Sequence, residues 1–220
     1  MAEKQVISKK RVADHGEVLT GKREVNAMLD LVKQETERID SRFLEPACGT
    51  GNFLTEVLTR KLRVVSARYG KSQLEYERNA VLAVSSLYGI DILEDNVAEC
   101  RKRLFDIFDQ AYTGLFKNAA KDECRNAVRF ILSKNIIHGD ALKLSTVGPK
   151  PRPITFSEWS PVNGSMLKRR DYMLAYLVEK QGGYERSLFS DEDGRAADLK
   201  DPVKEYPLTH FLKVADAEQP

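Results

Sequence analysis

The segment from Phe43 to Leu54, FLEPACGTGNFL, constrains the fold most, because two closely spaced glycines separate a short apolar stretch from a helical pattern. Glycine is needed where the backbone adopts left-handed dihedrals or lies against a ligand, and a helix start offers unpaired N–H groups. The segment therefore predicts a strand, a tight turn and a helix that together hold a nucleotide-like ligand. The alternative is a strand-turn-helix corner that binds nothing.

Two common nucleotide-binding loops do not fit this segment. A phosphate-binding loop requires Lys followed by Ser or Thr after its last glycine, and a dinucleotide-binding loop requires the pattern GxGxxG. The segment instead has Glu45 after its apolar pair, followed by PACGTG. This form resembles the first motif of S-adenosylmethionine-dependent methyltransferases, especially the adenine-specific DNA methyltransferases of restriction-modification systems.

The resemblance implies roles for the residues of this motif. The glycines are expected to let the backbone approach S-adenosylmethionine, and Glu45 is expected to lie near the amino-acid end of the cofactor. The motif residues that we expect to bind the cofactor are Glu45, Ala47, Gly49, Gly51, Asn52 and Phe53.

A second segment, DHGEVLT from Asp14 to Thr20, precedes a helical pattern of apolar residues over 25–32. It resembles the N-terminal motif of the same enzymes, Gly-Glu/Gln-x-x-Thr-Pro, with Gly21 in place of the proline. The resemblance implies that Thr20 and the adjacent backbone contact the carboxylate of the cofactor. The alternative is that Thr20 only caps the following helix.

A third segment, AVSSLYGIDI from Ala83 to Ile92, is an apolar run that predicts a strand. A carboxylate at the carboxyl end of such a strand can accept both hydroxyls of a ribose. We expect Asp91 to be that carboxylate and Ile92 to pack on the adenine ring. The alternative is that Asp91 caps the next helix.

A fourth segment, NIIHGDAL from Asn135 to Leu142, predicts a short strand that ends in Gly-Asp-Ala. It resembles the motif in which an aspartate accepts a hydrogen bond from the adenine amino group of the cofactor. Asp140 and Ala141 are therefore expected in the cofactor site, although Gly-Asp is also common in turns that bind nothing. His138 has no metal-ligand spacing around it, so we expect no metal site.

The methyl-transfer loop is the weakest part of the resemblance. These enzymes need a fourth strand ending in Asp/Asn/Ser-Pro-Pro-aromatic, which holds the target amine and stacks on a flipped base. The candidate is ITFSEWSPVN, residues 154–163, in which Ser160 and Pro161 fit the first two positions. Val162 and Asn163 depart from the last two, which puts methyl transfer by this chain alone in doubt.

The remaining sequence predicts no recognition domain. Residues 166–180 are interpreted as a helix, the acidic run 190–195 as a loop or linker, and residues 202–212 as an edge strand or a docking segment. We therefore expect a methyltransferase-like domain over 1–181, and a polar loop with a C-terminal tail over 182–220.

The composition fits one core domain, since the chain has 220 residues and a net charge of only +2. No run approaches the roughly 20 apolar residues that cross a bilayer, and no signal-peptide core is present, so we expect a cytoplasmic protein without membrane contact. Three widely spaced cysteines indicate free thiols. The basic triplets at 9–11, 101–103 and 168–170 are candidate phosphate contacts, although such triplets are usually solvated helix faces.

The motifs predict an α/β fold, a doubly wound Rossmann-like class I methyltransferase sheet with helices on both faces. The leading functional interpretation is an S-adenosylmethionine-dependent DNA adenine methyltransferase of a restriction-modification system, or its cofactor-binding subunit. DNA is the expected partner, together with a possible companion protein that supplies target recognition or missing strands. The alternatives are a catalytically inactive cofactor-binding module that acts through a partner and, less favoured, an RNA or small-molecule methyltransferase.

Overall fold

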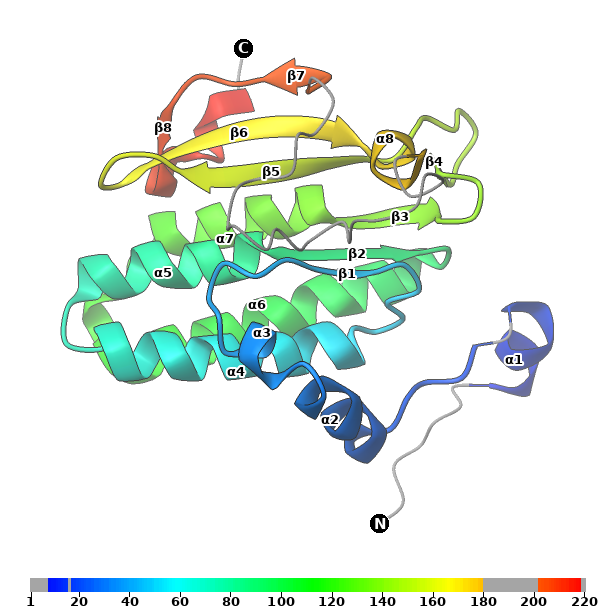
Figure 1. Ribbon diagram of the computed structural model, residues 1–220, viewed down its shortest axis with the longest axis horizontal. Coiled ribbons are helices and arrows are strands. Elements are labelled where there is room, and N and C mark those ends of the chain that lie inside the picture. Colours follow the sequence, from blue (N-terminus) through cyan, green and yellow to red (C-terminus); the bar gives the residue numbers. More distant parts are fainter. Residues whose placement is uncertain (1–7, 16, 180–201, 219–220) are drawn as a thin grey trace.

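The computed structural model describes residues 8–15, 17–179 and 202–218, and within them the fold is mixed α/β (Figure 1). Three parallel strands form its centre: β1 (Phe43–Glu45), β2 (Leu87–Asp91) and β3 (Ile136–Asp140). The short β4 (Ser145–Thr146) pairs antiparallel with β3, which gives the order β1-β2-β3-β4. The parallel strands therefore end at one common edge of the sheet.

Helices make both crossovers between the parallel strands. α4 and α5 link β1 to β2, and α6 and α7 link β2 to β3, while α1, α2 and α3 precede the sheet. α4 and α6 cover one face of the sheet, and α5 and α7 lie beyond the amino ends of the strands (Figure 1). The helix bounds are α1 Lys9–His15, α2 Lys22–Asp30, α3 Lys33–Thr36, α4 Asn52–Tyr69, α5 Gln73–Ser85, α6 Glu94–Phe116, η1 Lys117–Ala119 and α7 Asp122–Asn135.

A second, antiparallel sheet covers the other face. It contains β5 (Thr155–Pro161) and β6 (Met166–Met173), with the short β7 (Lys204–Glu205) and β8 (Thr209–His210) paired on β6. Ile154 and the ring of Phe156 pack on Tyr88 and Ile90 of β2, with the rings of Phe156 and Tyr88 5.3 Å apart. Among the described residues this face carries strands, which corrects the expectation of helices on both faces.

Residues 166–180 also differ from the expected single helix, because β6 occupies their first half and α8 (Leu174–Glu179) follows it. A tight turn joins β5 to β6: Val162 N donates to Met166 O over 3.0 Å, and Gly164 has a φ of +56°. Burial then alternates along β6, as expected of a strand with one packed face. The apolar residues of this segment are compatible with a helix or a strand, and hydrogen bonding to β5 stabilises the strand.

The end of the chain packs on the same sheet. After β8, the short helices η3 (Phe211–Lys213) and η4 (Asp216–Glu218) lie against α7, and Tyr206, Phe211 and Val214 are buried. Residues 202–212 thus supply edge strands to β6, which is one of the two roles expected of them. The acidic run at 190–195 lies outside the described residues.

The apolar run from Ala83 to Ile92 divides between two elements. Its first residues finish α5, and β2 begins only at Leu87. A continuous apolar run does not distinguish a buried helix end from a buried strand, so the expected strand was too long. No helix in the described part of the chain is both long enough and apolar enough to cross a bilayer.

A buried lysine joins the amino ends of β1 and β2. Lys61 of α4 is fully buried, and its Nζ donates to the carbonyl oxygens of Ile39 and Ser41 and to the hydroxyl of Ser86. Burial lowers the pKa of Lys61 from 10.5 to about 7, because the charged form loses its hydration.

Candidate functional site

A cavity of about 380 Å³ lies at the carboxyl ends of the three parallel strands. Residues from four segments line it: 17–20 before α2, 45–53 after β1, 91–96 after β2, and 139–142 after β3. Cavities that bind small ligands are of similar volume, and this edge of an open α/β sheet is where ligands usually bind. The cavity is therefore the candidate site.

The structure gathers almost all of the residues predicted for cofactor binding around this cavity. Those that line it are Thr20, Glu45, Ala47, Gly49, Asn52, Phe53, Asp91, Ile92, Asp140 and Ala141. Gly51 does not line the cavity and instead directly precedes α4. Segments separated by up to 120 positions in the sequence thus meet as their order and spacing predicted.

Both motif glycines adopt backbone conformations that favour glycine. Gly49 has a φ of +52° and Gly51 a φ of +88°, in the left-handed region. A β-carbon on Gly51 would lie 2.6 Å from Cys100 Sγ of α6, and one on Gly49 would lie 3.3 Å from Leu19 Cδ2. Gly51 thus permits the close approach of α6, and Gly49 permits the approach of the N-terminal segment.

Asp91 holds the glycine turn against β2. Its carboxylate accepts hydrogen bonds from Gly49 N (2.8 Å), Leu93 N (2.9 Å) and Asn96 Nδ2 (3.1 Å). A carboxylate has about four acceptor sites, so Asp91 keeps capacity for about one further hydrogen bond. The residue that precedes α6 is Leu93, so Asp91 is not the cap of that helix in the strict sense.

Thr20 is also not a helix cap. Gly21 precedes α2, and no side chain caps that helix. The carbonyl oxygen of Thr20 accepts a hydrogen bond from Asn52 Nδ2 over 2.8 Å, which ties the N-terminal segment to the start of α4. The alternative interpretation of Thr20 as a cap is therefore wrong, and Thr20 lines the cavity.

The other two predicted carboxylates differ in their electrostatics. Burial raises the pKa of Glu45. Within the described structure, a hydrogen bond from the backbone amide of Ala47 opposes this rise. The amide of Lys143 lowers the pKa of Asp140 most, and the Lys143 ammonium lies 3.3 Å from the carboxylate. Asp140 also accepts from Leu142 N over 3.0 Å, so it stabilises its own turn while it lines the cavity.

Three further residues support the site and were not predicted: Glu17, Asn96 and Arg103. Glu17 and Asn96 line the cavity and are joined by a hydrogen bond of 2.7 Å. Arg103 Nη1 donates to Thr50 O and to Asn52 Oδ1, and so fixes the glycine turn from α6. The sequence signal for the last two is their seven-residue spacing on α6, which places them on one helix face.

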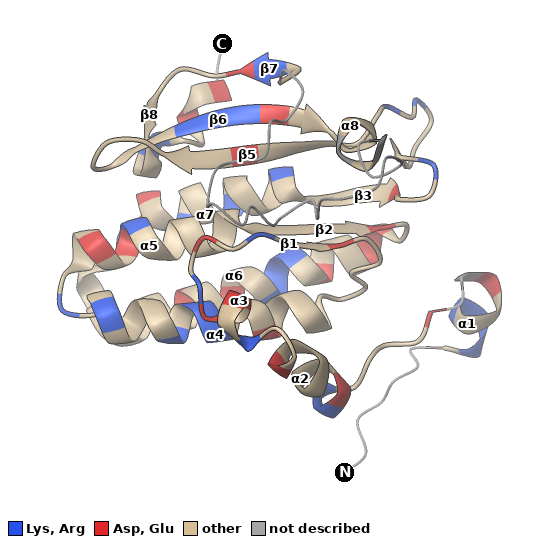
Figure 2. Cartoon of the chain, in the orientation of Figure 1, with Lys and Arg blue, Asp and Glu red and all other residues tan. Residues whose placement is uncertain are grey.

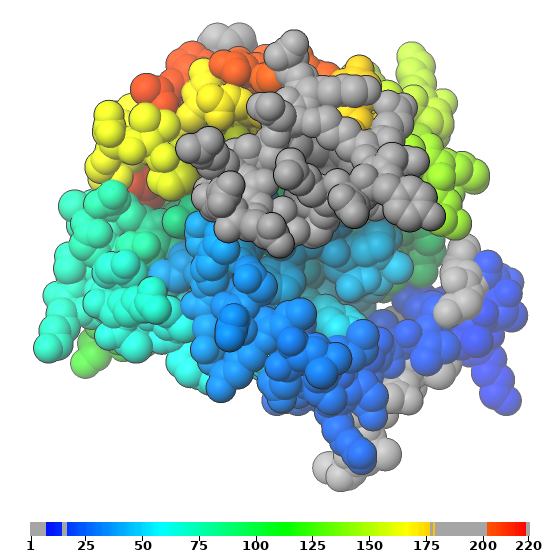
Figure 3. Space-filling view, in the orientation of Figure 1, coloured from blue at the N-terminus to red at the C-terminus, as the bar shows by residue number. Residues whose placement is uncertain are grey.

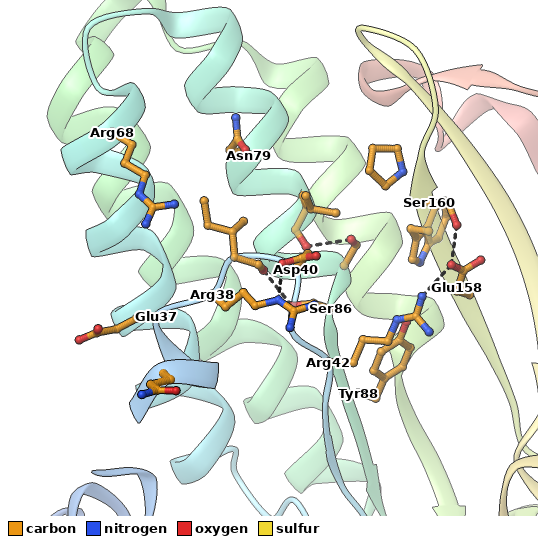
Figure 4. Close-up of a pocket in the computed structure, with 16 residues that line it drawn as sticks. Glu37, Arg38, Asp40, Arg42, Arg68, Asn79, Ser86, Tyr88, Glu158 and Ser160 are labelled. Carbon is orange, nitrogen blue, oxygen red and sulfur yellow. Dashed lines mark hydrogen bonds and ion pairs between the residues drawn. The ribbon is translucent and has the colours of Figure 1, made fainter. Parts of the chain in front are cut away.

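Ser160 and Pro161 do not lie at this cavity. They line a second cavity, of about 670 Å³, together with Ser86 and other residues that precede β1 and β2 (Figure 4). β5 crosses the parallel strands in the opposite sense and carries Ser160 to their amino ends (Figure 1). There Ser160 Oγ donates to Glu158 Oε1, which also pairs with Arg42 over 2.8 Å.

This position corrects the expectation that residues 154–163 form a fourth strand of the parallel sheet. Such a strand would end beside β1, at the edge that holds the cavity. The sequence of β5 has the alternation of a strand, but its partner is β6, and pairing with β6 places it in the antiparallel sheet.

The basic triplets are largely engaged within the protein, although Figure 2 shows Lys and Arg in many of the helices and along β6. Arg101 donates to the carbonyl oxygen of Ile136, and Arg103 holds the glycine turn. On β6, Lys168 and Arg170 pair with Glu205, and Arg169 forms a buried ion pair with Asp171. These contacts weaken the triplets as candidate phosphate contacts.

The described residues hold no cluster of three His, Cys, Asp or Glu side chains that could bind a metal ion. Cys48, Cys100 and Cys124 are all buried and free. The hydrogen bond with the neighbouring Cys100, together with burial, raises the pKa of Cys48, so its thiol stays protonated.

A protein-family model described as "MmeI, DNA-methyltransferase domain" matches residues 19–150. No curated protein and no solved structure matches the chain. The matched stretch contains every residue that we predicted to bind the cofactor, from Thr20 to Ala141, and it ends before β5.

Proposed function

Because the chain belongs to the family of the MmeI DNA-methyltransferase domain, we propose that it binds S-adenosylmethionine at the carboxyl ends of β1, β2 and β3. The chain with its bound cofactor is part of an enzyme that methylates the amino group of adenine in DNA. The observation that carries this proposal is the gathering of Glu45, Asp91 and Asp140 around one cavity beside a glycine turn.

The donor and acceptor groups of the cavity fit the cofactor. Glu45 accepts from its ammonium group, Asp91 from a ribose hydroxyl, and Asp140 from the adenine amino group. The first amides of α4 offer the positive end of a helix to its carboxylate, and Ile92, which is 43% exposed, offers an apolar surface to the adenine ring. S-adenosylmethionine supplies the methyl group when it is bound.

We further propose that this chain is the cofactor-binding subunit of the enzyme. Ser160 and Pro161 lie at the opposite edge of the parallel sheet from the cavity. A polar group must contact the target amine in line with the methyl group, and no described residue after Leu142 lines the cavity, so we assign the loop that holds adenine to a companion polypeptide. The second candidate is an inactive cofactor-binding module, which the same separation favours.

Isothermal titration calorimetry with S-adenosylmethionine tests the cofactor site. We expect saturable binding by the wild-type chain and at least tenfold weaker binding by Asp91→Asn, because the amide cannot accept as the carboxylate does. Asp106→Asn is the matched control, since Asp106 lies on the exposed face of α6 and pairs with Lys102 of the same helix. Equal affinity of wild type and Asp91→Asn would overturn the assignment.

Methyl transfer tests the subunit interpretation. Unmethylated DNA is incubated with S-adenosylmethionine labelled in its methyl group, first with this chain alone and then with the product of a neighbouring gene added. We expect label in adenine only in the second reaction. Label with the chain alone would contradict the subunit proposal, and cofactor binding without transfer in either reaction would favour the inactive module.

A further inference from the structure

A network of polar side chains connects the outer surface of the protein to the floor of the cavity. Arg11 of α1 donates to both carboxylate oxygens of Glu17, and its Nη2 donates to Asn96 Oδ1 over 2.9 Å. Asn96 Nδ2 donates in turn to Glu17 and to Asp91, and Asp91 accepts from Gly49 N. One chain of hydrogen bonds thus runs from α1 to the glycine turn.

The segment fastened by this network forms one wall of the cavity. We call residues 17–20 the latch, since all four line the cavity. Arg11 and Asn96 hold its first residue, Glu17, whose side chain is only 8% exposed. At its other end, the carbonyl of Thr20 is held by Asn52, which accepts from Arg103.

Arg11 itself does not line the cavity, and it also pairs with Asp95 at the start of α6. Its guanidinium therefore bridges two parts of the chain that meet only in the folded site, the latch and the first turn of α6. α1 lies at the surface, beside the edge where the parallel strands end (Figures 1 and 3). Release of Arg11 removes its ion pairs with Glu17 and Asp95 and leaves Glu17 with the hydrogen bond from Asn96.

We propose that Arg11 and Asn96 are positioning residues that hold the latch closed over the bound cofactor and so slow its release. This inference rests on the proposed function, because it assigns them to the S-adenosylmethionine site. Asn96 acts on both walls at once, since it contacts Glu17 of the latch and Asp91 at the end of β2. Arg11 acts only through Glu17, Asp95 and Asn96.

The kinetics of cofactor binding separate this role from a general loss of stability. In stopped-flow measurements we expect Arg11→Met to raise the dissociation rate of S-adenosylmethionine at least fivefold and to change the association rate less than twofold. Arg11→Lys restores little, because an ammonium cannot bridge the three partners as the planar guanidinium does. The matched control is Arg63→Met on the exposed surface of α4, which leaves both rates unchanged.

A double-mutant cycle tests whether the two residues act through the same latch. We expect the effect of Arg11→Met combined with Asn96→Ala on the dissociation rate to be smaller than the product of the single effects. An unchanged dissociation rate in Arg11→Met would overturn the inference while the proposed function stands.

Hydrogen exchange in the cofactor-free chain gives a readout that does not depend on the ligand. We expect the amides of the latch to exchange faster in Arg11→Met, with α4 and α6 unchanged. Equal exchange in wild type and variant refutes the fastening by Arg11. Failure of the wild type to bind S-adenosylmethionine refutes the proposed function and, with it, the role assigned to the latch.

Discussion

Gly51→Ala tests the geometry of the glycine turn directly. Gly51 has a φ of +88°, and its α-carbon faces Cys100, so a methyl group there meets strain and a close contact together. A left-handed conformation costs an L-residue about 1–2 kcal/mol. Overpacking of a well-packed site costs a further 1–3 kcal/mol or so. We therefore expect Gly51→Ala to lower the free energy of unfolding by about 2–5 kcal/mol.

Gly114→Ala is the matched control, because it makes the same chemical change within α6. Beyond its neighbours and the backbone of its own helix, a β-carbon at Gly114 meets no atom of the described residues within 4 Å, and Gly114 is exposed. Alanine in a helix interior is more stable than glycine by roughly 0.5–1 kcal/mol. The two variants should thus change stability in opposite directions.

Urea denaturation followed by circular dichroism measures both variants. Adding Cys100→Ala to Gly51→Ala should recover the steric part of the loss and leave the strain, so the two substitutions should be non-additive. If Gly51→Ala is as stable as the wild type, neither the left-handed turn nor the contact with Cys100 exists as described.

Three other substitutions test separate parts of the structure. The unfolded chain binds more protons at Lys61 between pH 7 and 10.5, so stability should rise with pH there by up to about 1.4 kcal/mol per pH unit, and Lys61→Met should flatten that rise in urea titrations. Asp171→Ala removes one of the two carboxylates that pair with the buried Arg169 and leaves Glu218, so it should cost about 1–3 kcal/mol in the same assay. Ser160→Ala should leave the calorimetric affinity for S-adenosylmethionine within twofold of wild type, and a larger loss would contradict the separation of the two cavities.

The grouping of residues around the candidate site could be predicted from the sequence because each of its parts is local. A strand followed by Gly49 and Gly51 specifies a turn through backbone dihedrals alone. Asp91 and Asp140 each end a parallel strand, and parallel strands bring their carboxyl ends to one edge whatever lies between them. Asn96 and Arg103 were missed because their seven-residue spacing marks one face of α6 but does not say that this face packs against the turn.

The position of Ser160 could not be predicted for the opposite reason. Alternation along residues 154–160 predicts a strand, but a strand carries no local mark of the sheet it joins or of its direction. That choice was made by β6, whose residues had been interpreted as a helix. Because the pairing of β5 with β6 was not foreseen, Ser160 was expected at the carboxyl edge of the parallel sheet, whereas it lies at the amino edge.

The charges around the cavity imply a preference between cofactor and product. Its described lining includes Glu17, Glu45, Asp91 and Asp140, with no Lys or Arg among the residues that line it. Arg11 compensates Glu17 and Lys143 compensates Asp140, so Glu45 and Asp91 supply most of the uncompensated negative charge.

S-adenosylmethionine carries a sulfonium charge that S-adenosylhomocysteine lacks. We expect calorimetry to give several-fold tighter binding of S-adenosylmethionine than of S-adenosylhomocysteine. This difference in affinity should become smaller as salt is added, and it should also be smaller in Glu45→Gln. Equal affinities at low salt would show that the carboxylates do not act on the sulfonium.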